Sequence, residues 1–188
     1  MKQELNIQVS DALKAKFNEG DKDGLRIGGV FTVEHIRNGE VIGSEVVPNI
    51  VTNEGLDYIL DCAMSNGTQN ATHYIGIFSN NYTPQAANVM ATFAGVGVAN
   101  EITTEVDEIN RPTWVEPGVS AQTITNSASP AVFTANTTVS AYGAFLSSDN
   151  TLDGTTGVLV AASKFAAVRN LLNTDTLNVT YTLNIADA

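Results

Sequence analysis

Strict two-residue alternation of apolar and polar side chains is the feature that most constrains the fold of this chain. In the segment "TLNVTYTLN", Leu177, Val179, Tyr181 and Leu183 alternate with threonine and asparagine. Successive side chains of a β-strand point to opposite faces, so this pattern predicts a strand with one buried and one solvated face. Strands of this kind are typical of antiparallel sheets.

Further strand signals recur along the chain, separated by turn residues. Residues 25–47 predict a β-hairpin, because "LRIGGVFTVEHI" and "VIGSEVV" flank "RNGE", whose Asn-Gly pair favours a type I′ turn. Residues 73–79, three pieces between 122 and 148, residues 155–168 and the closing segment add more strands. The fold class expected is mainly β, an antiparallel β-sandwich of jelly-roll or immunoglobulin-like type; a partly open barrel shares the pattern.

One short helix interrupts this β pattern, at about residues 53–64. Thr52 or Asn53 is suited to cap it, and Glu54 falls in the first turn, where the helix dipole favours an acid. Apolar residues follow the i, i+3, i+4, i+7 spacing of one buried stripe: Leu56, Ile59, Leu60 and Ala63. We therefore expect the helix to close one end of the sandwich or to cover an open sheet edge.

The first 23 residues look like a separate arm, which gives two parts: the arm, 1–23, and the β-sandwich domain, 24–188. A short helix beginning at Ser10 would place Leu13 and Phe17 on one face, and "EGDKDG" reads as a polar linker. The arm has too little apolar surface to fold alone, so it docks on its own domain or on a neighbour. No apolar leader segment is seen at the start, so no secretory signal is expected.

Charge and composition exclude several classes of partner. The formal net charge is −11, and no lysine or arginine occurs between Arg111 and Lys164. Nucleic acids and anionic membranes both require clustered basic side chains, so neither is expected as a partner. No apolar run approaches the ~18 residues that span a bilayer. The single cysteine, Cys62, cannot form an internal disulfide and is read as a small buried hydrophobe rather than a reactive thiol.

The sequence contains no recognisable motif for catalysis or for binding a cofactor or a metal. His35 and His73 are far apart in sequence, and no His-x-x-x-His, Cys-x-x-Cys, Gly-x-Ser-x-Gly or phosphate-binding loop is present. The acidic run from Glu101 to Glu108 offers oxygens for Ca²⁺ but matches no EF-hand, so a solvated strand face is favoured. We expect no enzyme activity and no cofactor, although paired carboxylates from distant strands remain an open alternative.

The segment "EVDEINRPTWVEPG" (105–118) is the one constellation that stands out. Arg111 is a lone base among acids and is expected to pair with Glu105 or Glu108, while Trp114 brings a large apolar surface. Such residues can anchor a neighbouring subunit. The structural alternative, a strand with a salt bridge and a core tryptophan, is favoured. The arm and the long loop 80–100 are further expected contact elements. The candidate partner contacts are therefore Leu13, Phe17, Tyr82, Arg111 and Trp114.

An ordered set of short motifs resembles a group of small structural proteins of tailed bacteriophages. The order is "PNIVTNEGLDYILD", "HYIGIFSNNYTP", "EINRPTWVEPG", "ITNSASPAVFTANTTVSAYGAFLSS" and "TGVLVAASKFAAVRNLLNTDTLNVTYTLNI". The group has N-(I/L)-V-(T/V)-N-x-G-L-D, Y-(I/V)-G-(I/L), R-P-x-W and G-A-F-L segments followed by a D-T-L-x-V-T-Y-T-L strand. The resemblance covers roughly residues 25–186 and leaves the arm outside.

The resemblance implies a virion component without enzymatic activity, found in the virion and assembled in the bacterial host cytoplasm. A capsid decoration or cement subunit is the role we expect, with the major capsid protein or other virion subunits as partners and a homo-oligomeric state. A neck or tail adaptor, or a fibre-base component, is the alternative within the same class. From the residues, a glycan-binding attachment module remains a further alternative, with Tyr74, Tyr82 and Trp114 as the aromatic side chains that would contact a sugar.

Overall fold

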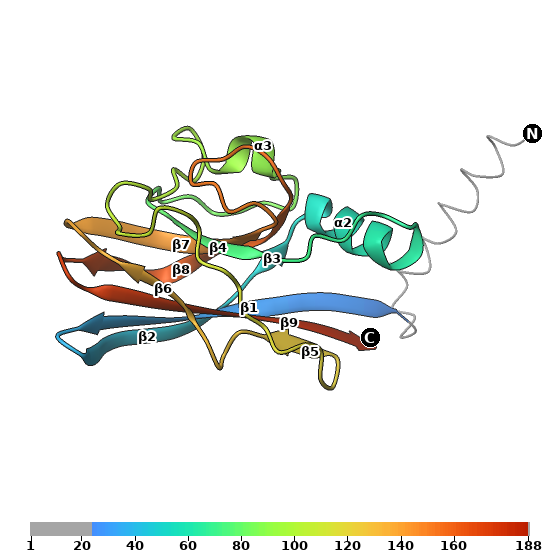
Figure 1. Cartoon of the computed structure of the whole chain (residues 1–188), viewed down its shortest axis with the longest axis horizontal. Helices are drawn as coiled ribbons and strands as arrows, with labels where there is room; N and C mark the ends of the chain where they lie inside the picture. Colours follow the sequence, from blue (N-terminus) through green and yellow to red (C-terminus); the bar gives the residue numbers. More distant parts are fainter. Residues whose placement is uncertain (1–23, 188) are drawn as a thin grey trace, which may run out of the picture. The chain divides into compact units, whose positions relative to one another are not determined.

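Two antiparallel β-sheets form a β-sandwich in the computed structural model, which describes residues 24–187 (Figure 1). The expected fold class is thereby confirmed. Gly28–Asn184 form one compact unit. The elements are β1 (Leu25–Arg37), β2 (Glu40–Pro48), β3 (Ile50–Val51), α2 (Asn53–Met64), β4 (Tyr74–Phe78), α3 (Met90–Phe93), β5 (Thr123–Thr125), β6 (Ala131–Thr134), β7 (Val139–Ser147), β8 (Leu159–Leu171) and β9 (Thr176–Asp187).

The strand order separates the chain into a first and a second sheet. The first sheet has the order β2-β1-β9-β5, with β6 also paired to β9, and the second has the order β3-β8-β7-β4. The predicted hairpin is β1 and β2, in antiparallel register from Val30–Pro48 to Arg37–Glu40. Asn38 and Gly39 at its turn have φ angles of 52° and 81°, as the two central residues of a type I′ turn require.

The main core lies between the two sheets and comes from the inward faces of their strands. Phe31 and Val33 of β1, Ile75 and Ile77 of β4, and Tyr181 of β9 are each 0% exposed. The alternation of the closing segment is confirmed for Leu177, Val179 and Tyr181, which are buried, while Leu183 is partly buried against the same core. Burial of such side chains contributes about 1.5–3 kcal/mol each before entropy is counted.

A second, smaller core lies on the other face of the second sheet. Phe78, Phe145, Leu159 and Ala162 of the sheet meet side chains of the loop 80–100. From that loop, Met90 and Phe93 of α3 are 0% exposed, and Ala94 and Ala99 are also buried. Figure 1 shows α3 and its flanking loops above β7 and β4. The long loop 80–100 therefore contains a short helix that seals this face of the sheet.

Two glycines of the second sheet make room for aromatic rings on the neighbouring strand. Gly76 pairs with Phe145 and Gly143 pairs with Phe78 across β4 and β7. A Cβ atom at either glycine would overlap the ring of its partner. Each ring lies over the backbone of the opposite glycine, which explains why glycine occupies these strand positions.

Helix α2 has the predicted bounds but not the predicted packing. Thr52 caps it, accepting a hydrogen bond from Gly55 N at 3.0 Å, and Thr52 Oγ1 donates to the carbonyl of Leu159. Gly55 is the buried position, since a Cβ there would overlap the backbone of Val160. The expected buried stripe is wrong: Ile59 is only half-buried, and Leu56, Leu60 and Ala63 are exposed. The helix thus touches the sheet through its first turn and leaves its apolar ridge in solvent.

Candidate functional site

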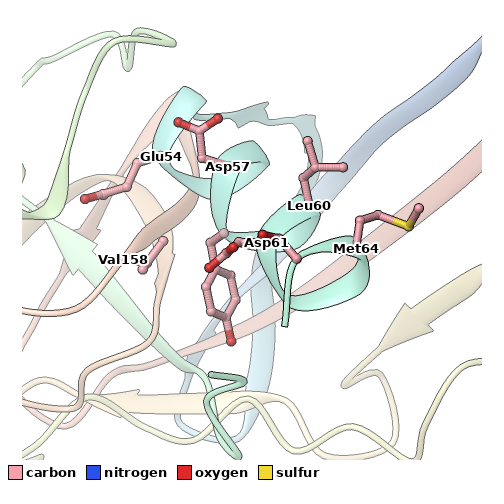
Figure 2. Close-up of a pocket in the computed structure, with 8 residues that line it drawn as sticks. Glu54, Asp57, Leu60, Asp61, Met64 and Val158 are labelled. Carbon is pink, nitrogen blue, oxygen red and sulfur yellow. The ribbon is translucent and has the colours of Figure 1, made fainter. Parts of the chain in front are cut away.

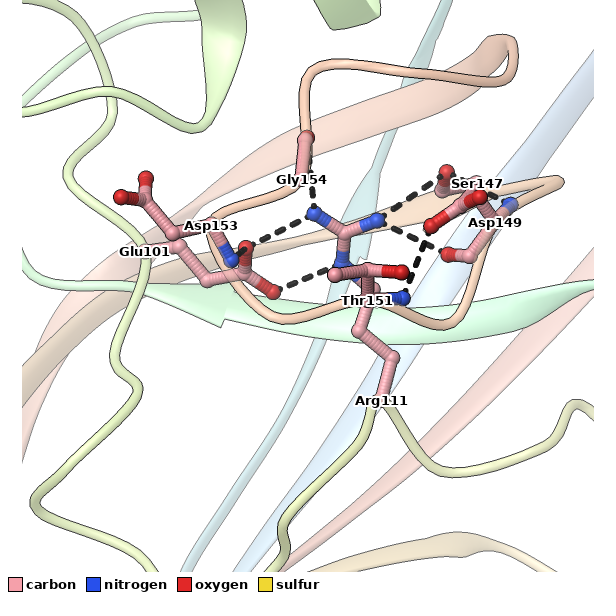
Figure 3. A network of polar contacts seen from close by, with 7 residues as sticks. All are labelled: Glu101, Arg111, Ser147, Asp149, Thr151, Asp153 and Gly154. Atoms are coloured by element: carbon pink, nitrogen blue, oxygen red, sulfur yellow. Dashed lines mark hydrogen bonds and ion pairs between the residues drawn. The ribbon is translucent and has the colours of Figure 1, made fainter.

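A buried guanidinium, that of Arg111, lies at the centre of a polar network. The Arg111 side chain is 0% exposed, and so is that of Glu101. Arg111 Nε donates to Glu101 Oε1 at 2.7 Å and Arg111 Nη2 donates to Glu101 Oε2 at 2.8 Å, a bidentate pair (Figure 3). The ring of Phe145 lies below the guanidinium, with its centroid 5.1 Å from Cζ.

The same two side chains organise the loop between β7 and β8. Arg111 Nη1 donates to the Asp149 carbonyl at 2.8 Å and Nη2 donates to the Gly154 carbonyl at 3.3 Å. Glu101 Oε2 accepts from Asp153 N at 2.7 Å. Backbone donation from Thr151, with a smaller contribution from the charge of Arg111, holds the pKa of the Asp149 carboxyl below its usual value. These hydrogen bonds from Arg111 and Glu101 therefore hold the loop 149–154 in place.

The expected pairing of Arg111 with Glu105 or Glu108 is wrong. Glu105 accepts hydrogen bonds from the backbone N–H groups of Thr103 and Thr104, and both Glu108 oxygens accept from Thr134 N. The segment that carries them is not a strand either, since Val106 and Thr113 make only isolated bridges. Glu105 accepts from neighbouring backbone N–H groups and Glu108 accepts from a distant one, so the ion pair of Arg111 forms with Glu101.

Trp114 is a core residue in this chain. It is 7% exposed, and its indole N–H donates to the Tyr181 carbonyl at 3.1 Å. The centroid of its ring lies 5.9 Å from the ring centroid of Tyr181 and 6.2 Å from the ring centroid of His73. Burial of Arg111 and Trp114 favours the structural reading of this segment, since neither side chain is presented to a neighbouring subunit.

The other candidate contacts have different surroundings. Tyr82 is half-buried: its ring packs against Phe93 at 6.1 Å, and its hydroxyl accepts a hydrogen bond from Asn88 Nδ2 at 2.9 Å. Tyr74 is also half-buried. Trp114 lies in the core and is not presented to a sugar, whereas Tyr74 and Tyr82 keep part of their surface exposed, so the glycan-binding alternative stays a prediction for these two tyrosines. Leu13 and Phe17 lie outside the described residues, so their role stays a prediction.

A histidine, an arginine and an aspartate form a polar cluster that the sequence did not reveal. His35 Nε2 lies 2.8 Å from Asp175 Oδ2, and Arg37 Nη2 lies 2.7 Å from the same oxygen. Leu172 N also donates to Asp175 Oδ2, at 2.8 Å. Hydrogen bonds from Arg37, and then from Leu172 N and His35, hold the pKa of the Asp175 carboxyl far below its usual value, against the opposing effect of burial. The cluster fastens β1 to the turn between β8 and β9.

A small hollow of about 180 Å³ lies beside Trp114, lined also by His73 and Glu116. Burial lowers the pKa of His73, and the charge of Glu116 opposes the shift. Among the described residues, 24–187, no group of three or more His, Cys, Asp or Glu side chains is placed to hold a metal ion. His35 and His73 are therefore not brought together into a metal site there.

A hollow of about 810 Å³ forms an open depression along helix α2 (Figure 2). Leu60 and Met64 line it together with the carboxylates of Asp57 and Asp61. Glu54 lies at its far end, where its Oε2 accepts from Met90 N at 2.9 Å and Leu159 N at 2.7 Å. The depression combines exposed apolar surface with two aspartates for which no ion pair is found among the described residues, which suits a partner that carries both apolar and basic groups.

No protein-family model matches the sequence, and no curated protein matches it. Membership of the phage structural group therefore stays a prediction based on the motifs. Within the described part of the chain, no helix is long and apolar enough to cross a membrane.

Proposed function

We propose that this chain is a non-enzymatic structural protein of a tailed-bacteriophage virion, and specifically a capsid decoration or cement subunit. The observation that carries the proposal is the ordered series of phage-like motifs in residues 25–186. Such a subunit acts by burying surface on its neighbours, about 1,600 Å² in a stable contact.

The places that the motifs take in the fold support a scaffold rather than a reaction. The R-P-x-W segment supplies Arg111, which holds the loop 149–154, and Trp114, which enters the core. The G-A-F-L segment lies in the middle of β7, and the D-T-L segment begins with Asp175 of the polar cluster. The R-P-x-W and D-T-L segments thus fix junctions between elements and the G-A-F-L segment packs within a strand, which is what a rigid assembly subunit needs.

The surface of the described residues also suits an assembly role. Three arginines of the described residues are in ion pairs, the buried Arg111 with Glu101, Arg37 with Asp175, and Arg169 with Glu45. The remaining acids leave a strongly negative surface that opposes nonspecific aggregation and nucleic-acid binding. Exposed apolar side chains gather on α2, where a partner can cover them.

Immunogold electron microscopy of purified virions tests the proposal. An antibody to this chain is expected to label the whole head surface, as many copies of a cement subunit would. Label confined to one vertex or to the tail would replace cementing by the neck, tail-adaptor or fibre-base role. Absence of label both on intact particles and on particles opened by mild denaturant would reject a virion role.

A further inference from the structure

The exposed ridge of α2 is an unusual feature for a solvated helix. Leu56, Leu60 and Met64 are 38%, 62% and 79% exposed. They are spaced by four residues, so they form one continuous row along the helix. The opposite side of the helix holds the packing contacts, through Gly55 and Tyr58. The row is therefore free of contacts with the described core, and a contiguous apolar row of this kind marks an interaction site.

The charges around the ridge restrict the partner. Asp57 and Asp61 lie beside Leu60 and Met64 in the open depression (Figure 2). The last turn of α2 carries no basic residue, although the helix dipole favours a cation there. The like charges of two α2 helices would repel each other, which disfavours a symmetric pairing of ridge on ridge. The occupant must bring an apolar face flanked by positive charge.

One segment of the chain itself has this composition. Residues 10–19, "SDALKAKFNE", hold Leu13 and Phe17 four residues apart, and in the helix expected there Lys14 and Lys16 would flank the stripe that these two form. The segment also holds Asp11 and Glu19, which the same spacing would place on the opposite face of that helix. By contrast, the arginines at 37, 111 and 169 are already held in ion pairs.

We propose that the ridge of α2 is a docking site for residues 10–19 of a second copy of this chain. The proposal rests on the assembly role proposed above, in which neighbouring copies are held close and the effective concentration of the segment is high. The segment of one copy meets the α2 of another, so two copies can exchange segments reciprocally, or each copy can give its segment to the next in a ring or a row. Leu13 and Phe17 cover Leu60 and Met64, and Lys14 and Lys16 neutralise Asp57 and Asp61.

Disulfide trapping between two differently labelled copies tests the contact. All chains carry Cys62→Ser, so the only thiols are the introduced ones. One chain carries Ser10→Cys, and the other carries Asn53→Cys or Met64→Cys, at the two ends of the ridge. After mixing and mild oxidation, mixed dimers are counted on a non-reducing gel with chains of different tag length. The matched control carries Ile109→Cys, which is 86% exposed and lies away from α2 in sequence.

The proposal predicts about ten-fold more mixed dimer with a ridge cysteine than with the Ile109→Cys control. Lys14→Glu/Lys16→Glu in the donor should reduce the yield to the control level, and Asp57→Lys/Asp61→Lys in the acceptor should restore it. Restoration by charge exchange also shows that both variant chains are folded. A yield equal to the control would overturn the proposal. The proposal would also be overturned if chains that carry both Ser10→Cys and Met64→Cys formed the disulfide only within one chain and never between two chains.

Failure of this contact is distinguishable from failure of the proposed function. Gold label over virion heads together with control-level trapping would keep the cement role and reject the α2 contact. Specific trapping in the absence of label on intact and opened particles would establish the contact and reject the virion role.

Discussion

Replacement of Arg111 by methionine is expected to cost about 3–5 kcal/mol of the free energy of unfolding. Methionine fills most of the volume of the arginine side chain but donates no hydrogen bond. The Glu101 carboxylate then keeps only one of its donors, Asp153 N. A carboxylate with 0% side-chain exposure is then left without its counter-charge. The carbonyls of Asp149 and Gly154 lose their donors as well, which adds to the loss.

The size of this loss makes it readily measurable. A domain of this length shifts its melting temperature by about 2–4 °C per kcal/mol, so the midpoint should fall by roughly 6–20 °C. Urea unfolding of the purified chain gives the free energy directly, provided that the slope with denaturant is unchanged. The matched control is Lys164→Met, since no ion pair of Lys164 is found among the described residues, and it should stay within about 0.5 kcal/mol of the parent.

A double-mutant cycle separates the ion pair from general packing. Arg111→Met with Glu101→Gln should be less destabilised than the sum of the two single variants, with a coupling of about 1–3 kcal/mol. Additive losses, or a loss below about 1 kcal/mol for Arg111→Met, would refute the account of a buried pair that fixes the loop 149–154.

Three further predictions concern packing and pH. Gly76→Ala should lower the free energy of unfolding, measured with urea, by about 1–3 kcal/mol, because the added Cβ overlaps the Phe145 ring. The double variant Gly76→Ala/Phe145→Leu should recover part of this loss. An unaltered stability of Gly76→Ala would contradict the overlap. Leu60→Ala should change stability by less than about 0.5 kcal/mol, since the side chain is 62% exposed, whereas a loss above about 2 kcal/mol would mean that the helix buries this face. Asp175→Asn should cost about 3 kcal/mol at pH 7. The folded-state pKa of Asp175 lies below its unfolded value of about 4, so this cost should shrink as pH falls below about 4 and should not shrink at higher pH.

The strands were predictable because their signal is local. Alternation places Leu177, Val179 and Tyr181 on one face, and that face lies in the core. The hairpin turn was predictable as well, because Asn38 and Gly39 tolerate positive φ angles that most residues avoid. Both predictions need only the residues of one or two neighbouring strands.

The packing of α2 was not predictable from its periodicity. Spacing shows that Leu56 and Leu60 share a face, but it does not show whether that face meets the sheet. The contact instead passes through Gly55, whose missing side chain allows the helix to approach the backbone of Val160. A glycine in the first turn of an otherwise good helix is the signal that could have indicated this close approach.

The polar clusters were missed for a related reason. Proximity in sequence predicts an ion pair between Arg111 and the nearest acids, but the Glu105 carboxylate accepts hydrogen bonds from neighbouring backbone N–H groups instead. Its actual partner, Glu101, lies ten residues away and is positioned by a bridge to Phe78 at the end of β4. His35 and Asp175 are 140 residues apart, so only the pairing of the sheet strands brings them together.

Thermal release of DNA from phage heads tests the central claim, that this chain cements a capsid, most directly. Particles assembled without the chain would be heated beside complete particles and beside deficient particles to which the purified chain has been returned. The account predicts release at a lower temperature from the deficient particles and recovery after the chain is added back. Identical release temperatures for all three, with the returned chain shown to be bound, would contradict a cementing role.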